Sequence, residues 1–506
     1  MRKVFSSIGR LPLFIGDGNL SESLDKSNRW YQLAEKLPWA KMEQVYISRL
    51  DPRRKGATNL PARLVLGAML IQYIEKLTDR GTITAIQENP YMQYFVGLTH
   101  FTTIPIFDAS LFVTLRKRIS IEDINEISLI LLKTEKNSTA KDEKRDSDGD
   151  KDTPSPCEEE KQSSTPEADE VTHQGSMIVD ATCCPVNIPY PTDLRLIYES
   201  IQKLCRIRLS YGKVSEKERQ SITKLSAEAK RRYHAYTLRK KKPKGGLKST
   251  LQRMLKLLEQ CIKGFLSQFG HNSTALLDRL SNTTKRYIQT ILKVYEQQSG
   301  KLYRGTKIAH RIVNIHQPHI RPIVRGKVGN PTEFGPKVNV SIVRSYAFID
   351  QLSYEAFNEG QKLEEQIQLY RSRFEFLPHK VLADRIYLNK NNCQYMESKD
   401  IIPIGKRLGR PPKQEKTEAE LKEMHQRNEV EGTFGTVKMR YGAARIRTRL
   451  PETTEVAVAM SFLAKNVITF LRELIRIILS LLFPSFFSPK LQIVRQYPAC
   501  VSILQK

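Results

Sequence analysis

Three carboxylates stand in the sequence where they could act on one substrate. Asp180 ends the apolar run SMIVD, Asp384 ends the run VLAD, and Glu431 lies in the polar stretch RNEVEGTFGTVKMRYG. A short apolar run that ends in an acid is typical of a buried strand that delivers a carboxylate at its end. The aspartates are 204 residues apart (384 minus 180), and Glu431 follows 47 residues later (431 minus 384). Each acid taken alone is more often a helix cap or a surface charge than a catalytic group.

The stretch around Glu431 carries charges at helical spacing. Arg427, Glu431 and Lys438 occupy positions i, i+4 and i+11, so at about 100° per residue they lie within about 40° of one another on one helical face. Glu429 points about 200° away from Glu431. A carboxylate between two cations could hold a metal ion while the cations hold phosphate. An ordinary ladder of ion pairs explains the same spacing equally well.

The whole chain is strongly basic. Its 506 residues carry a formal net charge of +28 and give a pI near 9.7, which indicates a polyanionic partner, either nucleic acid or an anionic membrane. No stretch reaches the roughly 18 uncharged apolar residues that a membrane-spanning helix needs, and the apolar core of the N-terminus is too short for a signal peptide. We therefore expect a cytoplasmic, nucleoid-associated protein with double-stranded DNA as partner and no membrane.

The cysteines and histidines do not indicate a metal or disulfide framework. The seven cysteines are odd in number and form no CxxC pair, so neither a disulfide framework nor a zinc site is expected, and reduced thiols fit the cytosol. His316 and His319 lack further ligand partners for zinc.

Composition divides the chain into four parts. Residues 1–133 are expected to be a helical DNA-binding region, because apolar residues recur there at three- and four-residue spacing. Residues 134–174 are expected to be a disordered acidic linker, since 135–170 hold 13 Asp and Glu against 6 Lys and Arg. Residues 175–484 are expected to form the catalytic domain, and 485–506 a C-terminal tail.

A basic helical insertion is expected within the catalytic domain at about 195–305. Residues 201–263 hold 19 Lys and Arg against 4 Asp and Glu. The segment RRYHAYTLRKKKPKGG interleaves tyrosines with cations, which suits phosphate contact with occasional base stacking. A solvated helical hairpin is the alternative. The candidate DNA-binding residues of this segment are Arg231, Arg232, Arg239, Lys240, Lys241 and Lys242.

Further elements follow from periodicity. β-Structure is expected at about 307–350, where TKIAHRIVNI and PKVNVSIVRSYAFID are rich in Val and Ile. Helices are expected at 354–375 and 418–441. The most hydrophobic segment, at about 456–483, is interrupted by charged residues on a helical repeat, which predicts a buried amphipathic helix.

Taken in order, several stretches resemble the DDE transposases of bacterial insertion sequences, in the large group around the insertion sequence four and five families. QENPYMQYFVGL and FDASLFVTLRKRI look like the group's N-terminal helical domain. The resemblance covers most of the chain outside the acidic linker. Its other stretches are VDATCCPVNIPYPTDL at 179–194, RIVNIHQPHIRPIVRGKVGNPTEFGPKVNVSIV at 311–343, VLADRIYLNKNN at 381–392, GKRLGRPPK at 405–413 and RNEVEGTFGTVKMRYG at 427–442.

The resemblance implies an α/β fold: a ribonuclease H-like catalytic core with a helical insertion, preceded by an all-α N-terminal domain. It also implies that Asp180 on the first strand, Asp384 on the fourth and Glu431 on a later helix are the catalytic metal ligands. They would hold two Mg²⁺ ions, for which Mn²⁺ substitutes. Hard divalent ions prefer carboxylate oxygens, and two ions about 3.5–4 Å apart can serve both the attacking and the leaving oxygen of a phosphodiester.

The family's helix signature of Tyr, Arg, Glu and Lys falls on Arg427, Glu431 and Lys438. Met424 fills the tyrosine position, so the chain departs from the family at a DNA-contacting side chain and keeps the ligand. Arg427 and Lys438 are accordingly expected to bind DNA.

The implied activity is binding of an element's terminal inverted repeats, cleavage at its ends and joining of the 3′ ends to target DNA. A homodimer or larger assembly on DNA is expected. Two alternatives stay open, a catalytically inactive transposase-derived DNA-binding protein and a metal-dependent nuclease without strand transfer. The presence of all three acids favours the active transposase.

Overall fold

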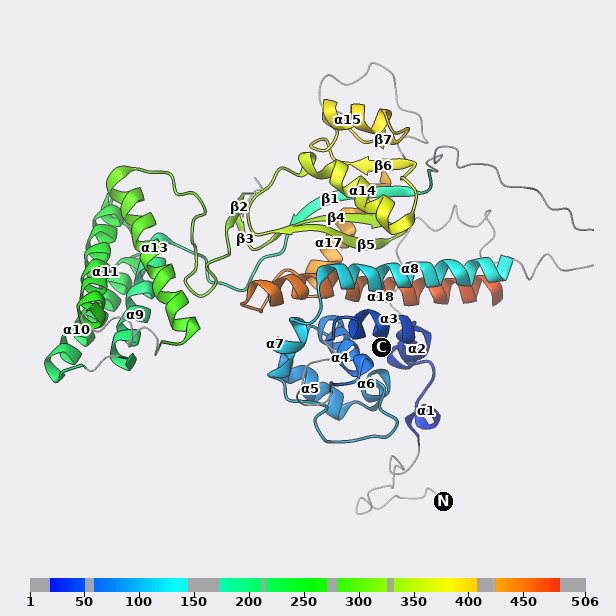
Figure 1. Ribbon diagram of the computed structural model, residues 1–506, viewed down its shortest axis with the longest axis horizontal. Helices are drawn as coiled ribbons and strands as arrows, with labels where there is room; N and C mark the ends of the chain where they lie inside the picture. The colour runs from blue at the N-terminus through cyan, green and yellow to red at the C-terminus, as the bar shows by residue number, and fades with distance from the viewer. Residues whose placement is uncertain are drawn as a thin grey trace, which may run out of the picture.

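A helical N-terminal region, a mixed sheet and a bundle of long helices are arranged around one long C-terminal helix in the computed structural model (Figure 1). The expected tail, Met424 and most of the expected linker lie outside the described residues. The structure describes residues 19–50, 59–143, 173–211, 214–270, 280–324, 332–406, 422 and 425–482.

The N-terminal region is helical, as the spacing of its apolar residues predicts. Side-chain caps begin several of its helices: Asn28, Thr78 and Asn89 each accept a hydrogen bond from a backbone N–H of the first turn. Its helices are α1 (Leu20–Ser23), α2 (Arg29–Lys36), α3 (Trp39–Ile47), α4 (Ala62–Ile74), α5 (Asp79–Glu88), α6 (Pro90–Phe95), α7 (Leu111–Arg116) and α8 (Ile121–Glu143).

Helix α8 extends ten residues past position 133, where the linker was expected to begin (143 minus 133). The expected boundary was therefore too early. Glu135 is buried and accepts a hydrogen bond of 2.6 Å from the hydroxyl of Tyr346 in the sheet. A tertiary partner of this kind supports a polar helical turn that composition alone assigns to a linker.

The sheet has five strands in the order β5-β4-β1-β6-β7. Strand β1 pairs antiparallel with β4 and parallel with β6, β4 pairs antiparallel with β5, and β6 pairs parallel with β7. Together with the helices this is a mixed α/β fold, as expected. The strands are β1 (Ser176–Cys183), β4 (Lys337–Val343), β5 (Tyr346–Ser353), β6 (Lys380–Ala383) and β7 (Ile402–Ile404).

Short elements surround this sheet. A 3-10 turn η1 (Glu359–Lys362) leads into α14 (Leu363–Phe374), and α15 (Lys390–Glu397) joins β6 to β7. A separate two-stranded ribbon pairs β2 (Pro322–Val324) with β3 (Thr332–Phe334). The helix expected at 354–375 thus begins later, after a turn.

The β-structure expected at 307–316 is absent, since this described segment forms turns and irregular chain. Its Val and Ile content was misleading because side chains occupy the place of a neighbouring strand. The Gln297 side-chain oxygen accepts a hydrogen bond of 3.1 Å from the backbone N–H of Ile312, and the Asn314 side-chain oxygen accepts one of 2.7 Å from that of His316.

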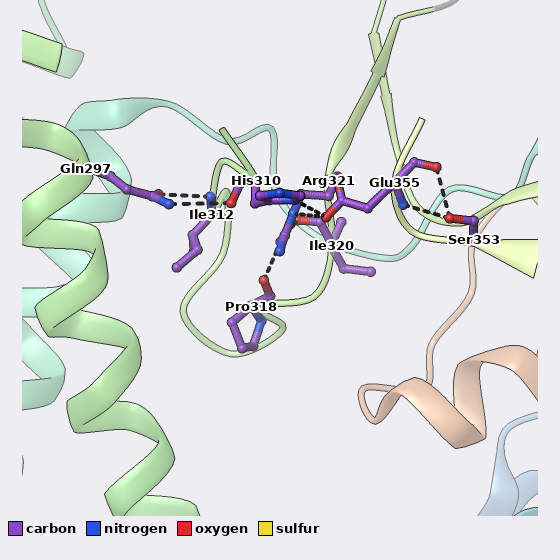
Figure 2. A network of polar contacts seen from close by, with 8 residues as sticks. All are labelled: Gln297, His310, Ile312, Pro318, Ile320, Arg321, Ser353 and Glu355. Carbon is purple, nitrogen blue, oxygen red and sulfur yellow. Dashed lines mark hydrogen bonds and ion pairs between the residues drawn. The ribbon is translucent and has the colours of Figure 1, made fainter. Parts of the chain in front are cut away.

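The same segment is tied to the end of β5. Figure 2 shows His310 and Arg321 meeting the carboxylate of Glu355, at 2.9 Å and 3.0 Å. The backbone N–H of Glu355 donates to the hydroxyl of Ser353 at 3.1 Å, and the Arg321 guanidinium donates to the carbonyl of Pro318 at 2.5 Å. These contacts fix the return from the helical bundle to the sheet.

The bundle fills the expected insertion and has its own apolar core. Ile197, Leu204 and Leu258 are among the side chains buried in it. Figure 1 shows the bundle standing to one side of the sheet. Its helices are α9 (Asp193–Tyr211), α10 (Glu216–Thr237), α11 (Gly246–Gly270) and α13 (Asn282–Arg304).

Helix α18 (Pro451–Leu482) joins the N-terminal region to the sheet. It packs against α4, α8 and β5, and side chains from all of these belong to one continuous apolar core. Figure 1 shows α8 and α18 side by side. The part Pro451–Ile477 has the length and apolarity of a membrane span, yet 89% of its most apolar window is buried inside the protein. The prediction of a buried helix here is confirmed.

Candidate active site

Two aspartates lie side by side because their strands are parallel neighbours. The register of β1 and β6 places Val179 opposite Ala383, so Asp180 and Asp384 follow where this parallel pairing ends. Asp384 directly follows β6, but β1 continues to Cys183, so the prediction that Asp180 ends its strand is wrong. Adjacent strands lie about 4.8 Å apart. Each carboxylate accepts a hydrogen bond of 2.7 Å from the backbone N–H of the residue after it.

The third acid lies on α17 (Asn428–Arg440), within the helix expected at 418–441. Of the earlier part of that range, residues 422, 425 and 426 are helical, and 418–421, 423 and 424 lie outside the described residues. The buried side chains of this helix include Val430, Phe434 and Val437, and the helix packs on β1 and α18. Glu431 lies on the solvent side, with its side chain 63% exposed.

Arg427 connects the strand acids to the helical acid. Its guanidinium lies 3.9 Å from a carboxylate oxygen of Asp384 and 3.4 Å from one of Glu431. Its charge also acts on Asp180. The structure thus gathers Asp180, Asp384 and Glu431 around one cation, although they are remote in sequence.

The electrostatics of Asp180 reflect this crowding. The pKa of this half-buried carboxyl is raised to about 6, mainly by burial, and the nearby carboxylates Glu359 and Asp384 act in the same direction. The backbone N–H of Ala181 and the charge of Arg427 act in the opposite direction. The negative charges of the carboxylates around Asp180 therefore outweigh the positive charge of Arg427.

Glu359 is a charged neighbour that the sequence analysis missed. It begins η1 and forms an ion pair of 2.6 Å with Lys337. Tyr387 is a second neighbour, uncharged and fully buried, with its hydroxyl donating to the side-chain oxygen of Asn339 at 2.6 Å. Glu359 lies outside the matching stretches, and Tyr387 lies within VLADRIYLNKNN but was given no role there. The packing of η1 and of the chain after β6 brings both residues to the aspartates.

The donor chemistry of the site fits a hard divalent ion. Asp180, Asp384 and Glu431 offer carboxylate oxygens only, which Mg²⁺ prefers, and the crowding of negative charge favours a bound cation. Across the described ranges, no three His, Cys, Asp or Glu side chains form a cluster close enough to hold a metal as they stand. The site therefore fits a divalent metal ion in the type of its ligands and in its charge, and not in the present spacing of the side chains.

The remaining charges of α17 divide between two sides. Glu429 acts electrostatically on Lys465 of α18, away from the acids. Lys438, seven residues after Glu431, lines a hollow at the far end of the helix.

The basic candidates of the insertion lie on the bundle and are not brought to the acids (Figure 1). Arg231 is exposed on α10, whereas Arg232 is half-buried and bonded to Glu228 at 2.9 Å. The ammonium of Lys242 lies 5.5 Å from the ring centre of Tyr236. The four cations of the α10–α11 turn, Arg239, Lys240, Lys241 and Lys242, are all exposed.

Comparisons with known proteins identify the class. Residues 18–118 match the family described as "Transposase domain (DUF772)", and residues 381–468 match "Transposase DDE domain". Both models describe transposases. The second match includes Asp384 and Glu431 but not β1 with Asp180.

More narrowly, the two matches and a weaker relative together support a DDE transposase of the insertion sequence four and five kind. The chain is similar to "Uncharacterized protein ORF8 in nfe locus" of Rhizobium meliloti, with 27% identity over 236 residues, which are 47% of this chain and 97% of that protein. No solved structure matches the chain significantly.

Proposed function

We propose that this protein is an active DNA transposase that binds the terminal inverted repeats of its element, cleaves at the ends and joins the 3′ ends to target DNA. One observation carries the proposal: the parallel pairing of β1 and β6 places Asp180 and Asp384 side by side, and Arg427 links Asp384 to Glu431. The order of the sheet, two antiparallel pairings followed by two parallel ones, supports a ribonuclease H-like core.

In this proposal Asp180, Asp384 and Glu431 hold two Mg²⁺ ions, or Mn²⁺ in their place. The ions supply activation of the attacking oxygen and stabilisation of the leaving oxygen. The protein fixes the ligands, because each aspartate is oriented by the backbone N–H that follows it. Arg427 holds an oxygen of the phosphate beside the acids, since its guanidinium already lies between two of them.

Binding of duplex DNA would be shared between parts of the chain. The N-terminal helical region would recognise the element ends, and the exposed cations of the α10–α11 turn would contact phosphate without sequence preference. Two ends would be paired by a homodimer or a larger assembly on the nucleoid DNA.

The test replaces each acid without adding bulk. Asp180→Asn, Asp384→Asn and Glu431→Gln should each abolish cleavage of a labelled element end with Mg²⁺, and should leave binding of that end largely unchanged in a gel-shift measurement. Glu429→Gln is the matched control, two residues from Glu431 on the other side of α17, and should reduce cleavage only slightly. Retained cutting by any of the three variants removes that residue from the site.

The two alternatives give different results with the unchanged protein. A transposase-derived DNA-binding protein would bind the ends and cut nothing. A nuclease without strand transfer would cut the ends and give no product joined to target DNA. Both outcomes are read from the same gel of labelled ends and target.

A further inference from the structure

A hollow of about 860 Å³ lies where three parts of the chain meet. The turn between α4 and α5 contributes Lys76, the first turn of α5 contributes Arg80, and the start of α13 contributes Arg286. The chain after α17 contributes residues 441, 442 and 444–450. We call it the basic cleft. The N-terminal region, the helical insertion and the end of the catalytic region therefore share one surface.

The charged side chains that line the basic cleft are almost all cationic. Their only carboxylate among the described lining residues is Asp79, which forms an ion pair with the buried Arg116. The lining thus holds eight cations against one carboxylate. The eight are Lys76, Arg80, Arg116, Arg286, Lys438, Arg445, Arg447 and Arg449.

Three of these cations form a row. Arg445, Arg447 and Arg449 are exposed and alternate with Ile446 and Thr448. The backbone N–H of Ile446, whose side chain is buried, donates to the carbonyl of residue 185 at 2.9 Å, and this anchors the segment beside the chain that follows β1.

In an extended segment, side chains two residues apart point to the same side about 6.6 Å apart. That is close to twice the 3.4 Å axial rise between phosphates on one DNA strand. The chain forms a bridge at Ile446 and is irregular at 447–449, and its alternating exposed arginines suit contact with a phosphate backbone.

Cations also lie close to a tyrosine and a histidine of the lining. The ammonium of Lys203 lies 4.1 Å from the ring centre of Tyr287, whose hydroxyl is bonded to His316 at 2.8 Å. Burial lowers the pKa of His316, and the charges of Arg449, Lys203 and Arg206 lower it further, against the opposing effect of Glu199. Positive charge gathered this closely disfavours further protonation and favours an anion.

The basic cleft adjoins the three acids. Lys438 lines it and follows Glu431 by seven residues on α17, a rise of about 10 Å along the helix. DNA with a phosphate at the acids would need to extend only that far to enter the cleft.

We propose that the basic cleft binds the backbone of duplex DNA next to the cleaved phosphate, with Arg445, Arg447 and Arg449 as its main contacts. The identity of the polyanion rests on the proposed function. The cleft is separate from the exposed α10–α11 turn, and it makes the N-terminal region and the insertion two walls of one DNA channel.

The test is the salt dependence of binding to an element-end duplex, measured with the full chain. Replacing Arg445, Arg447 and Arg449 together by Gln should lower the slope of log affinity against log salt by about 2.7, since each lost phosphate contact accounts for about 0.9. The DNA concentration for half-maximal cleavage should rise.

Two further variants keep the result interpretable. Arg445 also donates to Asn187 at 2.8 Å, so the double variant Arg447→Gln/Arg449→Gln leaves that contact intact and should lower the slope by about 1.8. The control replaces three exposed or half-buried cations of surface ion pairs, Lys263, Lys362 and Arg476, by Gln. It removes the same charge and should leave the slope unchanged.

An unchanged slope in both cleft variants, or an equal loss in the control, would overturn the proposal. If the unchanged protein cuts DNA but the cleft variants keep its salt-dependence slope, DNA binding in the cleft is refuted and the proposed transposase activity is not. If the slope of the cleft variants is lower as expected but the unchanged protein never cuts DNA, the cleft proposal holds and the proposed catalysis is refuted.

Discussion

Single side chains hold the parts of this protein at their junctions, and Asp193 is a clear case. It begins α9 and accepts hydrogen bonds from Gln298 at 3.1 Å, Lys301 at 2.6 Å and Arg311 at 2.5 Å. Burial acts to raise the pKa of Asp193, but Lys301 and Arg311 together outweigh it and hold that pKa below its ordinary value. One carboxylate thus joins two helices of the bundle to the chain that returns to the sheet.

Asp193→Asn should lower the free energy of unfolding by about 2 kcal/mol at pH 7, because charge-assisted hydrogen bonds are lost. A carboxyl whose folded pKa is depressed contributes stability that is present above its unfolded pKa, near 3.9, and is lost as the pH falls through the folded value. The difference between the variant and the unchanged protein should therefore narrow below about pH 4. Urea unfolding at pH 7 and pH 3 measures it, and an equal difference at both would contradict this role.

At the scale of elements, α18 completes the edge of the sheet. Strand β5 is an edge strand, whose free backbone groups need partners. The buried side chain of Asn466 accepts from the N–H of Ala347 at 2.9 Å and donates to its carbonyl at 2.8 Å. It also donates to the hydroxyl of Ser128 on α8 at 3.0 Å. One amide therefore joins α18, β5 and α8.

Asn466→Ala should cost about 3 kcal/mol of folding stability, because it leaves buried backbone groups of β5 without partners. Ser461→Ala is the matched control: Ser461 is also fully buried on α18, but its hydroxyl bonds only within the helix, to the carbonyl of Ala457. Chemical denaturation of both variants provides the comparison. A control as damaging as Asn466→Ala would show that the contact with β5 is unimportant.

At the scale of the whole molecule, the N-terminal region is not a separate body. Trp30, Leu66 and Leu131 share one continuous apolar core with Val340 of the sheet and Phe462 of α18. The sequence analysis treated residues 1–133 as a unit divided from the rest by a linker. The packing of α8 and α4 against α18 instead makes the two regions interdependent.

Residues 1–143 and 173–506, expressed as two chains in one cell, should therefore copurify as a one-to-one complex, since the apolar faces of α8 and α18 cover each other. Each chain expressed alone should aggregate, because that face is then exposed. Size-exclusion chromatography with both fragments measures it. Stable, separately eluting fragments would favour independent domains, and failure of the pair to fold would show that residues 144–172 are needed.

Local sequence patterns were sufficient for several features of this protein. The strands at Asp180 and before Asp384 were predicted from short apolar runs that end in an acid, although β1 continues past Asp180 to Cys183. Helix α18 follows from apolar residues on a helical repeat. The alternating arginines at 445–449 were equally readable, but nothing local said that they line a hollow. At 307–316 local content misled, because the side chain of Gln297 on the preceding helix α13, and no strand, accepts a hydrogen bond from the backbone of Ile312.

Only the tertiary structure decided how these features meet. The register of β1 against β6 puts Asp180 beside Asp384, and the packing of α17 on β1 brings Glu431 and Arg427 to them. The basic cleft exists because three remote segments converge on it. Periodicity encodes which face of an element is buried. The choice of neighbour depends on contacts between residues far apart in the chain, and no local window contains both partners.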